Sequence, residues 1–202
     1  MSYKPTAKEV AALRERTGAG MMDCKNALEE TSGDIEKAVD LLKKKGILKG
    51  EKRAGRGASE GLIGHYIHFN GKVAVLVEVN CETDFVARTE AFQNLVRDLA
   101  QHIAGTPTPP IAVTTDQVPK DVVAREKAIY EAQVAESGKP EAIRTKMVQG
   151  KVKKYLEERV LMEQPFVKDE KQKVGDLVKL LSGTTGENVQ VRRFVRWDLG
   201  GE

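Results

Sequence analysis

The chain has 202 residues, of which 40% are hydrophobic, 31% are charged and 5% are aromatic, and its net charge is +3 at pH 7. This composition is typical of a soluble globular protein with one or two domains, and no stretch approaches the roughly 18 apolar residues of a membrane-spanning helix. Met1 to Val10 lacks the basic-then-apolar order of a secretory signal, so a cytoplasmic location is expected. Cys24 and Cys81 are too few for a disulfide framework and lie in no C-x-x-C pair, which favours reduced thiols.

The first fifty residues have the pattern of three short helices. Thr6 and Glu9 make a capping box for the first helix, which the turn Gly18-Ala19-Gly20 should end. The second is expected over Met21 to Thr31, and Asp34 can cap the third, which Gly46 should close. The third helix is expected to bury a stripe of apolar residues at helical spacing: Ile35, Ala38, Val39, Leu41 and Leu42. Residues 1–49 are therefore interpreted as a small three-helix recognition domain.

Residues 50–60 are basic and rich in glycine. Lys52, Arg53 and Arg56 lie among Gly50, Gly55 and Gly57. A solvated linker is favoured over an RNA contact, because no aromatic residue is interleaved for base stacking.

Alternating apolar residues predict a sheet beyond the linker. Leu62 to Phe69 and Lys72 to Val79 flank Asn70-Gly71, a strong signal for a hairpin with a type I′ turn. A third strand is expected over Val189 to Trp197, where Val189, Val191, Val195 and Trp197 would face the core.

The remaining segments have helical periodicity. Thr89 is expected to cap a helix whose buried stripe is Phe92, Leu95, Val96, Leu99 and Ile103. Two or three helices are expected from Lys120 to Val160, and a short one near Val174 to Leu181. The predicted fold class is α+β, with residues 61–202 forming a core domain of helices packed on a three-stranded antiparallel sheet.

The sequence contains no recognisable catalytic machinery. His65 and His68 are three apart in a predicted strand, so they point to opposite faces and cannot share a metal ion. His102 lies near the expected end of a helix, where a partly charged imidazole would suit the dipole. Nucleophile-elbow and phosphate-loop motifs are absent from the sequence. No enzyme activity, metal or cofactor is expected.

Two segments are candidates for contact with a partner. Met21 and Met22 start a helix and point about 100° apart, so at least one should be exposed as an adaptable apolar contact, with Arg14 as a charged anchor. The alternative is that both methionines pack at the edge of the bundle. The second segment, Glu82 to Arg88, follows a buried strand and precedes a helix. From its composition alone, Phe85 is either a core residue, which is slightly favoured, or a projecting side chain.

At these segments the sequence resembles the elongation factor Ts family, the bacterial nucleotide exchange factors for the GTPase EF-Tu. The resemblance is carried by LRERTGAGMMDCKNAL (Leu13 to Leu28), EVNCETDFVAR (Glu78 to Arg88) and EQPFVKD (Glu163 to Asp169), and by GDIEKAVDLLKKKG. It extends from about residue 5 to residue 200 in segment order. The chain length is similar to that of the compact form of the family.

The resemblance implies an activity and site residues. The N-terminal bundle would have a ubiquitin-associated-like (UBA-like) fold and would contact EF-Tu through Arg14, Met21 and Met22. The segment Thr83, Asp84, Phe85 and Val86 would enter EF-Tu near its Mg²⁺ and phosphate site and promote GDP release. Compact members act as homodimers, so a homodimer is expected, with no membrane association and no nucleic acid partner.

Two other functions remain open from the sequence. UBA-like bundles serve many partners, which allows a peptide-binding or nascent-chain-binding protein. The basic linker allows a factor associated with RNA or the ribosome.

Overall fold

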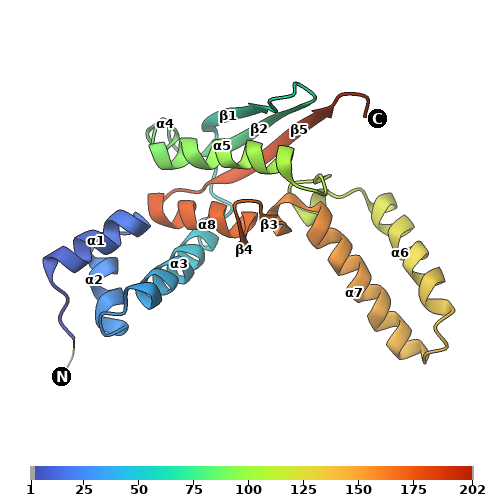
Figure 1. Cartoon of the computed structure of the whole chain (residues 1–202), viewed down its shortest axis with the longest axis horizontal. Helices are drawn as coiled ribbons and strands as arrows, with labels where there is room; N and C mark the ends of the chain where they lie inside the picture. The colour runs from blue at the N-terminus through green and yellow to red at the C-terminus, as the bar shows by residue number, and fades with distance from the viewer. Residues whose placement is uncertain (1–2, 202) are drawn as a thin grey trace. The chain divides into compact units, whose positions relative to one another are not determined.

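A computed structural model describes residues 3–201 and has the predicted α+β architecture (Figure 1). In chain order the elements are α1 (Ala7–Thr17), α2 (Met21–Glu30), α3 (Ile35–Glu51), β1 (Glu60–Ile67), β2 (Val73–Cys81), α4 (Asp84–Ala87), α5 (Glu90–Gly105), α6 (Lys120–Ala135), α7 (Glu141–Arg159), β3 (Pro165–Phe166), β4 (Asp169–Lys173), α8 (Val174–Thr185) and β5 (Gln190–Asp198). One sheet has the strand order β1-β2-β5, and β3 and β4 form a second, two-stranded antiparallel sheet. None of the helices among the described residues is long and apolar enough to cross a membrane.

The chain divides into two compact units. The first contains the residues up to Leu62 together with 79–95 and 176–190, and the second contains 63–78, 96–175 and the residues from Val191 onward. The division into 1–49, 50–60 and 61–202 stays a prediction.

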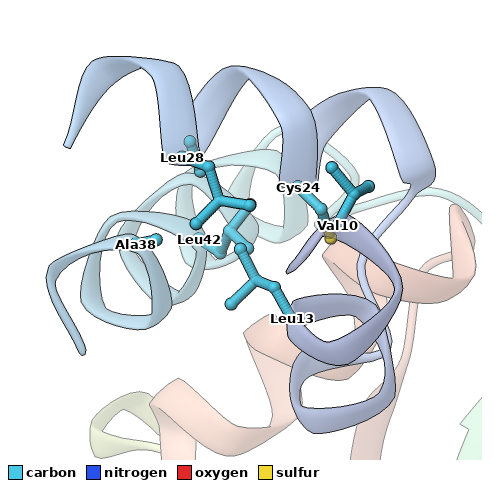
Figure 2. Close-up of a cluster of buried hydrophobic side chains, with 7 residues drawn as sticks. Val10, Leu13, Cys24, Leu28, Ala38 and Leu42 are labelled. Atoms are coloured by element: carbon cyan, nitrogen blue, oxygen red, sulfur yellow. The ribbon is translucent and has the colours of Figure 1, made fainter. Parts of the chain in front are cut away.

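The N-terminal bundle in the first unit begins its three helices, and ends the first two, where the sequence indicates. The Thr6–Glu9 capping box forms, Gly18 ends α1 with a φ of 65°, and the Asp34 side chain accepts a hydrogen bond from the Lys37 amide at 3.1 Å. The buried side chains form one cluster (Figure 2): Val10, Leu13, Cys24, Ala27, Leu28, Ala38 and Leu42. Ile35 is 38% exposed and does not belong to it, so its predicted burial is wrong.

The third helix is longer than predicted. α3 runs through Gly46 and Gly50 to Glu51, and α8 approaches it closely at both glycines. A Cβ atom on Gly46 would lie 2.6 Å from Leu180 Cδ1, and one on Gly50 would overlap the carbonyl oxygen of Lys179. Both glycines therefore lie inside a packed helix, where the absence of a Cβ atom allows the close approach.

The β1–β2 hairpin forms, but its turn is not type I′. A type I′ turn requires positive φ at both Asn70 and Gly71. Gly71 has a φ of 68°, but Asn70 does not have a positive φ, because Ser32 is the one non-glycine residue with positive φ in the described chain. The His68 carbonyl accepts the Gly71 amide at 2.8 Å, and the His68 amide donates to the Val73 carbonyl at 2.8 Å. These bonds close a longer loop, and the Asn70 side chain accepts the Lys72 amide at 2.9 Å.

The last strand changes phase part-way along. Val189 and Val191 are buried as predicted, but Val195 is 38% and Trp197 55% exposed, so the prediction that these two face the core is wrong. Arg192 and Arg193 donate to the same Glu78 carboxylate at 3.1 and 2.7 Å, although successive strand residues normally point to opposite faces. Beyond this irregularity the alternation is shifted by one residue. Phe194 and Arg196 therefore point inward, and Val195 and Trp197 point outward.

The other helices of the second unit cover or extend from the sheet. The predicted stripe from Phe92 to Ile103 on α5 is buried, and Thr89 accepts the Phe92 amide at 3.3 Å as its cap. Within this unit α5 packs on one sheet face, where Gly64 lies against Val96. α6 and α7 lie side by side as a helical hairpin (Figure 1), and α7 continues through Gly150.

Candidate protein-binding site

The start of α2 presents two methionines to solvent. Met21 and Met22 are 52% and 62% exposed, and Arg14 on α1 is exposed on the same bundle. Gly20 precedes the helix in an extended conformation, and Cys24 and Leu28 provide the buried side of α2, so both methionines remain outside the core. Exposed, flexible thioethers and an exposed cation on one small bundle are suited to an adaptable protein contact.

The segment after β2 presents an aromatic ring. Residues 84–87 form the one-turn helix α4, where the sequence indicates only a loop, and Phe85 on it is 78% exposed. The interpretation of Phe85 as a core residue is therefore wrong. Thr83 is the N-cap, and its hydroxyl accepts the Val86 amide at 3.4 Å. Thr83 and Val86 are half-buried, and they fix the turn from which Phe85 projects.

Asp84 lies beside the ring. Its carboxylate pairs with Arg88 one turn later at 2.7 Å, and the two side chains are 46% and 77% exposed. Exposed pairs of this kind contribute about 0.5 kcal/mol or less, so Asp84 can exchange Arg88 for a partner group at small cost. Asp84 and Phe85 therefore present a carboxylate and an aromatic ring from neighbouring positions of the four-residue helix α4.

A carboxylate from a distant part of the sequence holds the start of α4. Glu187, two residues after α8, accepts hydrogen bonds from the Thr83 hydroxyl at 2.6 Å, the Thr83 amide at 3.0 Å and the Glu82 amide at 3.1 Å. Sequence reasoning missed this residue. Its position after Gly186, which has a φ of 82°, marks a turn, but no local pattern connects it with a segment more than 100 residues earlier.

Glu82 and Asn188 bond the same two segments in the opposite direction. Glu82 accepts the Asn188 amide at 2.6 Å, and the Asn188 side chain donates to the Arg56 carbonyl at 2.6 Å. Arg53 donates to the Gly186 carbonyl at 2.8 Å. The basic segment after α3 therefore anchors the turn that carries Glu187.

Both thiols are kept protonated by their surroundings. Burial raises the pKa of Cys81, with the charge of Glu187 as a second cause, and the thiol donates to the Thr83 carbonyl at 3.1 Å. Burial also raises the pKa of Cys24 within the bundle core. Neither residue has the depressed pKa of a reactive cysteine.

The histidines hold structural positions. His102 is fully buried, and its Nε2 lies 3.0 Å from Gln164 Oε1 while its Nδ1 accepts the Val167 amide at 3.1 Å. Burial lowers its pKa, so the expectation of a partly charged imidazole at the helix end is wrong. His68 Nδ1 lies 3.1 Å from the Tyr66 hydroxyl.

The exposed aromatic ring of Phe85 on its hydrogen-bonded turn and the exposed pair Met21 and Met22 are side chains of a kind suited to contact with another protein. Comparison with known sequences assigns the family. The family model described as Elongation factor TS matches residues 7–201. The chain is 55% identical to the Elongation factor Ts of Synechococcus sp. (strain RCC307), over 96% of this chain and 89% of the relative. It is 50% identical to that of Syntrophobacter fumaroxidans (strain DSM 10017 / MPOB) over the full length of both chains. The chain belongs to the elongation factor Ts family of translation elongation factors.

Proposed function

We propose that this protein is the guanine nucleotide exchange factor for EF-Tu and that it promotes GDP release by inserting Asp84 and Phe85 near the Mg²⁺ and phosphate site of the GTPase. The observation that carries the proposal is the 78% exposure of Phe85 on a hydrogen-bonded turn. A large apolar side chain gains free energy when a partner covers it. Membership of the elongation factor Ts family supplies the partner. This role implies a cytoplasmic location.

Exchange of this kind requires binding energy and no bond-making by the chain. A protein that binds the empty or distorted GTPase better than the GDP·Mg²⁺ form weakens GDP binding by the same factor, because coupling between two ligands is reciprocal. A ~1,000-fold weakening requires roughly 4 kcal/mol of differential affinity. One buried aromatic with a few anchors supplies this amount. Mg²⁺ demands near-ideal octahedral geometry, so a displaced ligand shell loses it easily.

The N-terminal bundle is proposed to supply the recognition contact. Met21, Met22 and Arg14 are all exposed there. In this division of labour the bundle sets affinity, and Thr83 to Val86 sets the rate of GDP release at saturation.

A second copy of the chain is proposed to cover the outer face of the three-stranded sheet. In the second unit this face carries five exposed apolar side chains: Ile63, Ile67, Leu76, Val195 and Trp197. Several exposed apolar side chains on one sheet face are typical of an interface between protein chains.

The proposed function is tested by release of labelled GDP from EF-Tu. Phe85→Ala should lose most of the stimulation at saturating concentration and keep its thermal stability, since the ring packs little against its own chain. Phe69→Ala is the matched control, because Phe69 is 91% exposed in the hairpin loop outside the proposed contact. Wild-type chain that does not accelerate release would overturn the exchange function. Full stimulation by Phe85→Ala would remove the role of the ring alone.

A further inference from the structure

We propose that Glu187 is a positioning residue for nucleotide exchange, which holds the Thr83–Val86 segment in its insertion-ready conformation. This inference rests on the exchange function proposed above. Its basis is the convergence of three donors on one carboxylate: the Thr83 hydroxyl, the Thr83 amide and the Glu82 amide, at 2.6 to 3.1 Å. Hydrogen bonds to a charged acceptor are roughly twice as strong as neutral ones.

The segment needs external support because it has little of its own. α4 spans four residues, and a single helical turn is unstable in isolation. Phe85 is mostly exposed and contributes little packing to its own chain. The Thr83 hydroxyl makes two hydrogen bonds at once: it donates to Glu187, and it accepts the Val86 amide. Loss of the carboxylate therefore loosens the cap that orients the turn.

Glu187 is itself held in place. The Ser182 hydroxyl donates to the Glu187 carbonyl at 2.5 Å, and Ser182 is 2% exposed. The next residue, Asn188, is 4% exposed and is bonded to Glu82 and to the Arg56 carbonyl. The carboxylate thus acts from a fixed point, which is the condition for positioning another group.

The same bonds join the segment to the end of α3. Arg53 donates to the Lys49 carbonyl at 2.7 Å and to the Gly186 carbonyl at 2.8 Å. Lys179 on α8 pairs with Glu51 at 2.8 Å. The helix that ends the recognition bundle is therefore connected, through Arg53 and the turn at 186–188, to the residue that holds Thr83.

The kinetic consequence of this arrangement is specific. A segment ordered before binding spends no binding energy on becoming ordered. Removal of the carboxylate should therefore lower the rate of GDP release at saturation, while the concentration that gives half the maximal rate changes little, because the contact through Met21 and Met22 persists.

The first experiment tests, in the full-length chain without EF-Tu, whether Glu187 keeps the Thr83–Val86 segment ordered. In Glu187→Ala, amide hydrogen exchange measured by NMR should become at least ~10-fold faster at Thr83 and Val86, while Leu99 in the buried stripe of α5 stays within ~2-fold. Glu187→Gln keeps one acceptor oxygen and should lie between the wild type and the alanine variant. Glu170→Ala removes an exposed glutamate on β4 and is the charge-matched control. Unchanged protection at Thr83 and Val86 in Glu187→Ala would overturn the proposal.

The second experiment measures GDP release from EF-Tu. Glu187→Ala should reduce the saturating rate about tenfold, with the half-saturating concentration within ~3-fold of wild type. Thr83→Val removes the hydroxyl, and the loss of rate in the double variant should be smaller than the product of the two single losses, because both changes break the bond between the Thr83 hydroxyl and Glu187. Additive losses, or a saturating rate within ~2-fold of wild type, would overturn the positioning role. If the wild type itself fails to stimulate release, the exchange function fails, and amide exchange still decides whether Glu187 holds the segment.

Discussion

Gly183 of α8 and Gly46 of α3 meet backbone to backbone, so that a Cβ atom on Gly183 would overlap the carbonyl oxygen of Gly46. Gly50 makes a similar approach to the Lys179 carbonyl one turn later on α3. The two helices come together through glycine because any side chain at these positions would force them apart. This contact lies directly before Arg53, which extends the connection to the turn that carries Glu187.

Gly183→Ala should lower the free energy of unfolding by about 1–3 kcal/mol, because the added methyl group overpacks a backbone contact. Gly150→Ala is the matched control, since Gly150 also lies inside a helix but has open space around its Cα. The control should raise stability by about 0.5–1 kcal/mol through better helix propensity. Urea denaturation followed by circular dichroism measures both, and equal effects would contradict the packing role of Gly183.

Local signals were sufficient for the helix caps of the bundle and for α5. The Thr6–Glu9 box, Gly18, Asp34 and Thr89 act on backbone groups within a few residues, and all of them occupy the predicted caps. The stripe on α5 is a property of one helix and its period. Such features depend on neighbours in sequence, so they can be predicted from the sequence without knowledge of the fold.

Features that depend on distant residues were not predictable. Glycine after a helical stripe is a typical helix stop, and the contact of Gly46 with α8, which gives glycine a packing role there, involves residues more than 100 positions away. The phase change in β5 occurs where Arg192 and Arg193 both donate to Glu78 of another strand. The exposure of Phe85 was indicated by the family resemblance, whereas Glu187 had neither a local pattern nor a resemblance to point to it.

Met21→Ala and Met22→Ala should each raise the half-saturating concentration in the GDP-release assay about 5- to 30-fold and leave the saturating rate unchanged. Truncation of an apolar contact residue typically costs about 1–2 kcal/mol of binding. Neither change touches the bundle core, so the thermal midpoint should stay within about 2 °C. Ile143→Ala, an exposed apolar residue on α7, is the control. A fall in the saturating rate with unchanged affinity would contradict the division between recognition and insertion.

Trp197→Glu should convert the proposed homodimer into a monomer. Trp197 is 55% exposed at the end of the outer sheet face, and a second copy would bury the new carboxylate among Ile63, Ile67 and Val195 without a partner. The dissociation constant should rise at least ~10-fold, measured by analytical ultracentrifugation across a concentration series. Ile143→Glu places the same charge on an exposed apolar position of the helical hairpin and should leave the dimer intact. Dimers of equal strength in both variants would exclude this face as the interface.

His102 should make the folded state sensitive to mild acid. Burial holds its pKa below the ordinary value of 6.5, so the unfolded chain takes up a proton before the folded chain does. The free energy of unfolding is therefore unaffected by this group above pH 6.5 and falls as the pH drops from 6.5 towards the lower pKa of the folded state, by up to about 1.4 kcal/mol per pH unit. His102→Asn should flatten this dependence and, because the donor to Gln164 is lost, cost about 1–3 kcal/mol at pH 8. His65→Asn removes an exposed imidazole and should leave the dependence in place. Urea unfolding between pH 5 and 8 measures all three proteins, and an undiminished slope in His102→Asn would assign the acid sensitivity to another group.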